Sequence, residues 1–135
     1  MDFDGLMDDA LRGGPDALAI ACADVRAGFV IGASARGDAE WEAATNAAAC
    51  ASQLCATPRL EQGSVDDDDG RLDERIASSA LVVSSRWIHA YARVPERPEL
   101  IVVGVASGGA NVALLLDWVK RVAGGLRGHE LRAAF

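Results

Sequence analysis

The 135-residue chain has few aromatic side chains, a single lysine and no long apolar run. Aromatic residues make up 5% of the chain although half of it is hydrophobic, so a core must be built from Ala, Val, Leu and Ile. No apolar run approaches the ~20 residues that a membrane-spanning helix needs. The acidic N-terminus also lacks the basic start of a signal peptide. These absences predict one cytoplasmic domain, large enough to bury a core.

Acidic residues outnumber basic ones, and the formal net charge is −7 at pH 7. Binding to the phosphate backbone of nucleic acid needs a basic surface, as does attachment to an anionic membrane. We therefore expect neither nucleic acid nor a membrane as a partner. Only Lys120 among the 13 basic residues is a lysine. Together with the many alanines, this bias indicates a GC-rich bacterial genome.

Residues suited to metal binding or redox chemistry are also scarce. The cysteines Cys22, Cys50 and Cys55 form no C-x-x-C pair, and we expect all three to be reduced. The histidines His89 and His129 lie far apart in the sequence, and neither has a Cys or carboxylate at metal-ligand spacing. The sequence therefore predicts no metal site and no cofactor.

The acidic run at 66–69 raises the question of a calcium loop. Aligning Gly70 with the sixth position of an EF-hand loop puts Val65 first and Ile76 twelfth, so two essential oxygen ligands are missing. We expect a solvent-exposed acidic loop instead. The sequence gives no indication of what residues 61–74 bind.

The glycine-rich stretch "GVASGGANV" (104–112) is the one segment that resembles a catalytic or phosphate-binding loop. Its glycine spacing does not match a Rossmann fingerprint, no lysine completes a P-loop, and Ala106 stands where a nucleophile elbow needs serine. We expect Ser107 to be the N-cap of the following helix and the glycines to form a turn. A small hydrolase that uses Ser107 or His89 is the least favoured hypothesis.

The periodicity of apolar residues predicts the order of helices and strands. The elements are a helix at 2–12, strands at 17–23 and 29–35, a helix at 38–56, strands at 79–84, 87–93 and 100–106, and a helix at 109–123. Short connections between the last three strands permit only antiparallel neighbours. The predicted fold class is α+β, a five-stranded antiparallel sheet with three helices (α-β-β-α-β-β-β-α). It forms one domain over residues 1–125, followed by a partly disordered tail at 126–135.

The predicted strand 87–93 has one face of large polar and aromatic residues and one of small residues. The large face comprises Trp87, His89, Tyr91 and Arg93. Its residue types are typical of interfaces, so it either binds a partner or packs beneath a helix of the same chain. The opposite face, with Ala90 and Ala92, suits the leucine-rich helix 109–123.

The predicted helix 38–56 carries a seam of small residues at helical spacing, bordered by Trp41. The seam comprises Ala44, Ala48, Ala51 and Cys55. Such a seam fills little core volume but lets another element approach closely. Three neighbours fit it: the chain's own sheet, the same helix of a second copy, or a partner.

The order of elements resembles the Roadblock/LC7 family, which includes dynein light chains, endosomal scaffold subunits and bacterial gliding-motility regulators. The likeness covers residues 3–123 and is most specific in "WIHAYARVPERPELIVVGVASGGANVALLLDWVKRV" (87–122). As in that family, two hydrophobic strands and a short polar turn precede a leucine-rich helix, which Asn111 opens here. Two features depart from the pattern: the first hairpin turns at 24–28 rather than at Asp-Gly, and the acidic segment before the third strand is longer.

The resemblance implies a profilin-like architecture and a non-enzymatic homodimer in which the helix 38–56 and the strand "SALVV" (79–83) of each copy meet. The interface residues that it implies are Trp41, Ala44, Ala48, Ala51, Cys55, Leu81 and Val83. It also implies a partner, a Ras-like small GTPase or another signalling protein, whose GTP hydrolysis some bacterial members stimulate. No residue of the chain can be named as an arginine finger. The alternative is a small-ligand sensor of the PAS, GAF or profilin-like kind, which needs a ligand pocket.

Overall fold

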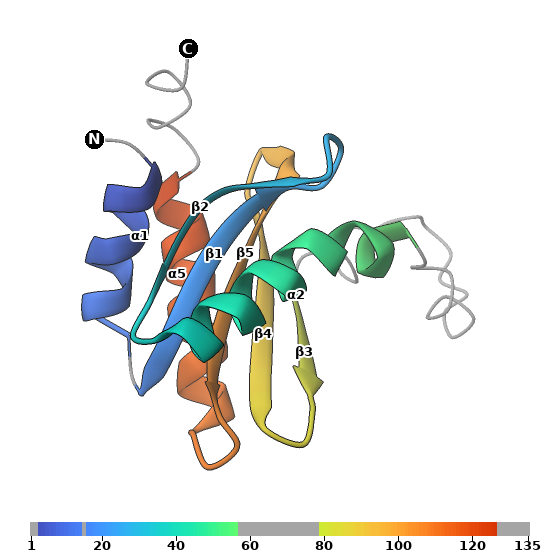
Figure 1. The fold of residues 1–135 in the computed structure, drawn as a ribbon. Coiled ribbons are helices and arrows are strands. Elements are labelled where there is room, and N and C mark those ends of the chain that lie inside the picture. Colours follow the sequence, from blue (N-terminus) through green and yellow to red (C-terminus); the bar gives the residue numbers. More distant parts are fainter. Residues whose placement is uncertain (1–2, 15, 57–78, 127–135) are drawn as a thin grey trace.

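The computed structural model describes residues 3–14, 16–56 and 79–126, apart from the side chains of 52–56 and 98. Its elements are α1 (Phe3–Arg12), β1 (Ala17–Asp24), β2 (Phe29–Ala35), α2 (Asp38–Ala56), β3 (Ser79–Val83), β4 (Trp87–Val94), β5 (Arg97–Ser107) and α5 (Val112–Leu126). Neighbouring strands are antiparallel, in the spatial order β2-β1-β5-β4-β3 (Figure 1). The predicted fold class and the predicted order of elements are confirmed.

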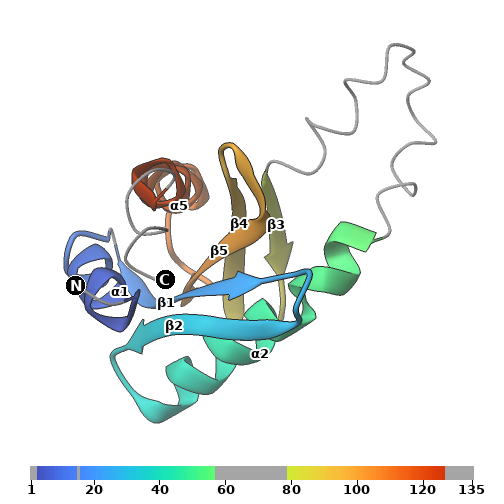
Figure 2. The ribbon, with the colours of Figure 1, turned by 90° about the horizontal axis from the view of Figure 1, so that it is seen from above.

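The sheet lies between two helical layers (Figure 2). On one face, α1 lies against β1 and β2, while α5 lies against β4 and β5. On the other face, α2 crosses β2, β1 and β5. Because successive side chains of a strand point to opposite faces, each strand contributes to both layers.

The core beneath α1 and α5 contains the large apolar side chains. Its fully buried members include Met7, Ile20, Val102 and Leu115. Trp118 of α5 is also buried and donates its Nε1–H to the carbonyl of Ala10 in α1, at 3.2 Å. This bond joins the two helices of the layer. The small face of β4 packs beneath α5, as the sequence predicts.

The core beneath α2 is built mainly from alanine. Ala44, Ala48 and Ala51 have at most 1% of their surface exposed. They share one buried cluster with alanines of β1 and with Val103 of β5. Because these alanines have no atoms beyond Cβ, the helix backbone can lie close to the sheet. Of the three neighbours that fit the seam, the chain's own sheet is the one that these alanines contact.

The turn between β1 and β2 is stabilised by the side chain of its first residue, Asp24. Asp24 Oδ1 accepts the backbone N–H groups of Arg26 and Ala27, both at 2.9 Å. Gly28 has a φ of 81°, which glycine adopts without steric cost. The hairpin predicted between residues 23 and 29 therefore forms with an Asx-type turn.

The turn between β4 and β5 is tighter than the sequence predicts. Pro95 is followed by Glu96, whose φ is 68°, the combination typical of a type II turn. Val94 pairs directly with Arg97 across it. As a result β5 begins at Arg97 rather than at residue 100, because the polar residues before Leu100 extend the hairpin.

The predicted bounds of the last helix are wrong at both ends. Asn111 is its N-cap, since its Oδ1 accepts the N–H of Leu114 at 3.0 Å, and the helix begins at Val112 rather than 109. Ser107, the predicted cap, is the last residue of β5. The helix then continues through Gly124 to Leu126, because buried Ala123 and Leu126 hold its last turn on the core. Residues 127–135 of the predicted tail lie outside the described residues.

We predict that Gly104→Ala destabilises the fold. A Cβ at Gly104 would lie 2.6 Å from Val119 Cγ2 and 2.9 Å from Trp118 Cζ3, so α5 must shift away from β5. Overpacking of this kind costs about 1–3 kcal/mol, measurable as a lower urea midpoint. The control is Gly108→Ala, whose Cβ meets no heavy atom within 4 Å. Equal midpoints for the two variants would contradict the close packing of α5 on β5.

Candidate interaction surface

Ser107 and His89, the residues considered for catalysis, lie on the neighbouring strands β5 and β4. Ser107 is exposed at the end of β5, where it pairs with Trp87. His89 lies within β4, between Val82 of β3 and Val105 of β5. Among the residues that the structure describes, no group of three or more His, Cys, Asp and Glu side chains could hold a metal ion. No described helix is long and apolar enough to cross a membrane.

Two cysteines are free thiols in contrasting surroundings. Cys22 is buried in β1, and this burial, followed by the charge of Asp24, raises the pKa of its thiol to about 12. A thiol with this pKa stays protonated and unreactive at neutral pH. Cys50 is exposed on α2. The side chain of Cys55 lies outside the described residues.

The most distinctive surface is the outer edge of β3. This strand is the last of the sheet and pairs only with β4 among the described residues. Leu81 and Val83 are 40% and 70% exposed. The strand "SALVV" contains no charge and no proline, the devices that usually prevent an edge strand from pairing with another chain. Its free backbone groups and apolar side chains make it a candidate interaction surface.

The two sides of this edge differ in character. Leu81 and Val83 lie on the α5 side, opposite Ala90 and Ile88 of β4, while Val82 lies on the α2 side, opposite His89. On the α2 side, Trp87 and His89 are only half-buried, because α2 makes its main contacts with β1, β2 and β5. The guanidinium of Arg86 lies 4.8 Å from the centre of the Trp87 ring.

The remaining face of β4 is therefore divided between core and surface. Tyr91 is buried in the cluster beneath α2, with 7% of its surface exposed. Burial, followed by the nearby Cys50, raises the pKa of the Tyr91 hydroxyl. Packing within the chain accounts for Tyr91, whereas binding of a partner by the half-buried Trp87 stays a prediction.

The residues implied for an interface do not lie on one surface. Ala44, Ala48 and Ala51 are buried against their own sheet, so none of them is exposed to a second molecule. Leu81 and Val83 are exposed at the β3 edge. Trp41 is 44% exposed, but it lies beside Val30 of β2, at the opposite edge of the sheet.

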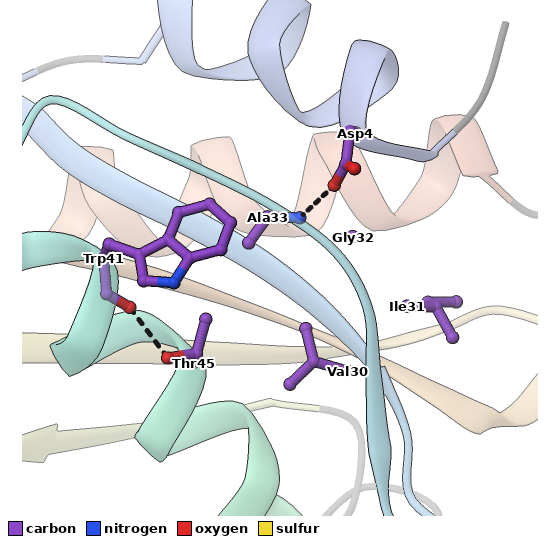
Figure 3. Close-up of a pocket in the computed structure, with 7 residues that line it drawn as sticks. All are labelled: Asp4, Val30, Ile31, Gly32, Ala33, Trp41 and Thr45. Atoms are coloured by element: carbon purple, nitrogen blue, oxygen red, sulfur yellow. Dashed lines mark hydrogen bonds between the residues drawn. The ribbon is translucent and has the colours of Figure 1, made fainter. Parts of the chain in front are cut away.

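A hollow at the β2 edge was not predicted from the sequence (Figure 3). It has a volume of about 290 Å³ and is open to solvent. Its lining combines α1, β2 and α2: Asp4, Val30, Ile31, Gly32, Ala33, Trp41 and Thr45. The spacing of Trp41 and Thr45 on one side of a helix is visible in the sequence. The sequence does not show that the fold brings Asp4 and Val30 beside Trp41 and Thr45.

His89 is a titratable group that pairs with Val82 of the edge strand β3. Burial lowers the pKa of its imidazole, and the backbone of Val82 opposes this shift only in part. Its Nδ1 is buried and has no hydrogen-bond partner among the described residues. The imidazole is therefore held neutral at neutral pH, and its protonation opposes folding.

Comparisons with known proteins identify the fold. No protein-family model matches the sequence, and no curated protein does. A Roadblock/LC7 domain from Streptomyces avermitilis matches with a TM-score of 0.67 and 18% identity, over 94% of this chain and 96% of that one. MglB from Myxococcus xanthus matches with a TM-score of 0.67 and 11% identity, over 98% and 88%. An MglB with a tetrameric arrangement matches with a TM-score of 0.65 and 14% identity, over 91% and 83%.

These matches cover nearly the whole chain, whose described residues form an antiparallel five-stranded sheet flanked by three helices. The protein has the Roadblock/LC7 fold, as its resemblance to that family implies.

We predict that His89 makes the fold less stable in acid. Because its folded pKa is lower than its unfolded pKa of about 6.5, the unfolded chain binds more protons between the two values. Stability is then complete above the unfolded pKa and falls as pH drops below it toward the folded pKa. Urea midpoints at pH 7.5 and pH 5.5 should differ less in His89→Gln than in the wild type. His129→Gln, the matched control, should keep the wild-type difference, and the same difference in His89→Gln would refute the assignment.

Proposed function

We propose that this protein is a non-enzymatic homodimeric regulator or scaffold that binds a Ras-like small GTPase. The observation that carries the proposal is the uncharged β3 edge, which no other described strand pairs with, on a Roadblock/LC7 fold. An edge of this kind favours pairing with another strand over exposure to water. A second copy of the chain supplies the matching strand without any further partner.

The proposed dimer joins two β3 strands in antiparallel fashion about a two-fold axis, so that the two sheets become one. Such an interface is isologous, and each residue meets its equivalent or a symmetric neighbour. Leu81 is the central residue of β3 and lies nearest the axis. The last turns of α2 extend toward the β3 side of the sheet (Figures 1 and 2), which would bring the two α2 helices near each other. The MglB with a tetrameric arrangement supports self-association on this fold.

The GTPase partner follows from the resemblance to the Roadblock/LC7 family. Members of that family bind or regulate Ras-like GTPases or act as adaptors, and the matches to MglB support the same role here. A dimer without an arginine finger would act by holding the switch regions of the GTPase in place. The alternative, a small-ligand sensor, needs a pocket that buries most of its ligand. The hollow beside β2 is open to solvent and would not enclose a ligand in this way.

Charge on the β3 edge should dissociate the dimer. We expect the wild type to have the mass of two chains by light scattering at micromolar concentration, and Leu81→Lys and Val83→Lys to have the mass of one. The lysines introduced at position 81 would face each other across the axis, whereas a lysine at position 83 would lie opposite Ser79 of the second copy and put a charge into the apolar interface. Phe29→Lys is the matched control, because Phe29 is 53% exposed on the opposite edge strand and should leave the dimer intact. A one-chain mass for the wild type would contradict the proposal.

Partner binding should depend on the nucleotide. We expect the tagged protein to retain a small GTPase from the source cytosol, identified by mass spectrometry, more strongly with a non-hydrolysable GTP analogue than with GDP. Hydrolysis by that purified GTPase can then be measured with and without the protein. Equal retention in both states indicates a scaffold rather than a regulator. If neither state retains a GTPase and the protein is monomeric, the sensor alternative is favoured.

A further inference from the structure

The hollow beside β2 is lined by both apolar and polar groups, and Asp4 is its one charged residue. Trp41 and Thr45 project from α2 and Val30 from β2, whereas Asp4 reaches the hollow from α1 (Figure 3). The hydroxyl of Thr45 is already bonded to the carbonyls of Trp41 and Glu42, at 2.9 and 3.4 Å, so it has no need of a ligand. What a ligand meets is the indole ring, apolar side chains and one carboxylate.

Asp4 is fixed in position but keeps bonding capacity. Its Oδ1 accepts the backbone N–H of Ala33 at 3.0 Å, which ties the first turn of α1 to the edge of β2. Phe3 packs over Gly32 beside it, where even a Cβ would lie 2.7 Å from Phe3 Cβ. A carboxylate has two oxygens with about four lone-pair sites, so Oδ2 can still accept from a cation.

Among the described residues, the surroundings of the hollow are acidic and offer no cation that is free of other bonds. Asp38 and Glu42 stand on the same part of α2 as Trp41, and no described residue forms an ion pair with either. Arg36 follows β2, but its Nε donates to the carbonyl of Ala17 at 2.8 Å. The guanidinium of Arg36 is therefore bonded to the backbone of β1. A ligand that carries positive charge complements this surface.

We propose that the hollow binds an arginine side chain from a basic segment of a partner protein. The aliphatic stem of arginine matches Val30 and Thr45, its planar guanidinium can stack on the Trp41 indole, and its N–H groups can bond the Asp4 carboxylate. An exposed tryptophan beside a charged group is also the composition typical of binding hot spots.

This site is separate from the proposed dimer edge. The strands β2 and β3 are at opposite ends of the sheet, four strand spacings apart, which is ~19 Å at ~4.8 Å for each spacing. The hollow therefore remains open whether or not two copies pair through β3. The proposal does not rest on the dimer or on a GTPase.

The test is a titration of the full-length protein followed by NMR, with the peptide acetyl-Ala-Arg-Ala-amide at millimolar concentration as the probe. The Trp41 indole signal, assigned with Trp41→Phe, and the amide signals of 30–33 should shift and saturate. The same peptide with citrulline has the shape of arginine without its charge and should cause no saturable shift.

Two variants with the same charge change provide the matched comparison. Asp4→Asn keeps an oxygen to accept the Ala33 N–H, so the fold is preserved, but it should weaken peptide binding about tenfold. Asp9 is on the same helix and pairs with Arg12. The variant Asp9→Asn should therefore leave peptide binding unchanged.

Three results would overturn the proposal. They are the absence of a shift with the arginine peptide, equal shifts with the citrulline peptide, and equal weakening in the two variants. A different outcome is a Trp41 signal that does not shift with the peptide but does shift in the variant with Arg127→Gln and Arg132→Gln. That outcome would assign the hollow to the chain's own C-terminal arginines instead.

Discussion

The contact between α2 and the sheet is the constraint on which the rest of the structure depends. Ala44, Ala48 and Ala51 meet a sheet surface whose β1 residues are also alanines. Each such pair buries little apolar area, so the helix is held by close approach along its length rather than by a few large side chains. The 19-residue length of α2 and its many alanines, the residue with the highest helix propensity, suit this form of packing.

This packing makes the two edges of the sheet different. α2 lies over β2, β1 and β5, and α1 covers the β2 edge through Phe3 over Gly32 and through the bond from Ala33 to Asp4. Ser34 also donates its hydroxyl hydrogen to Asp8 of the same helix. No equivalent element among the described residues covers β3. Within the described residues, one edge is therefore bonded to carboxylates of α1, while the other keeps Val82 and Val83 exposed.

The sequence was sufficient for the order of elements because their periodicities are strong. The alternation in β4 assigned Trp87 and Ala90 to opposite faces correctly, and the leucine spacing placed a helix against the small face. Local sequence placed the start of α5 too early because Ser107 and Asn111 are both good N-caps, whereas the family resemblance assigned Asn111 to the opening of the helix, as the structure has it. The neighbour of the small-residue seam of α2 could not be chosen from the sequence. Alanines occur on several sides of this helix, and an alanine does not distinguish a buried position from an exposed one.

The sheet order was the decisive missing information for the candidate surfaces. Chain order alone does not indicate that β5 inserts between β1 and β4, and this insertion is what moves β2 and β3 to opposite edges. Trp41 and Val83, which the resemblance grouped in one interface, are separated as a consequence. If two copies pair through β3, the hollows beside Trp41 lie at the outer ends of the joined sheet. A basic segment bound there would neither compete with the second copy nor need it, so the two contacts can be regulated independently.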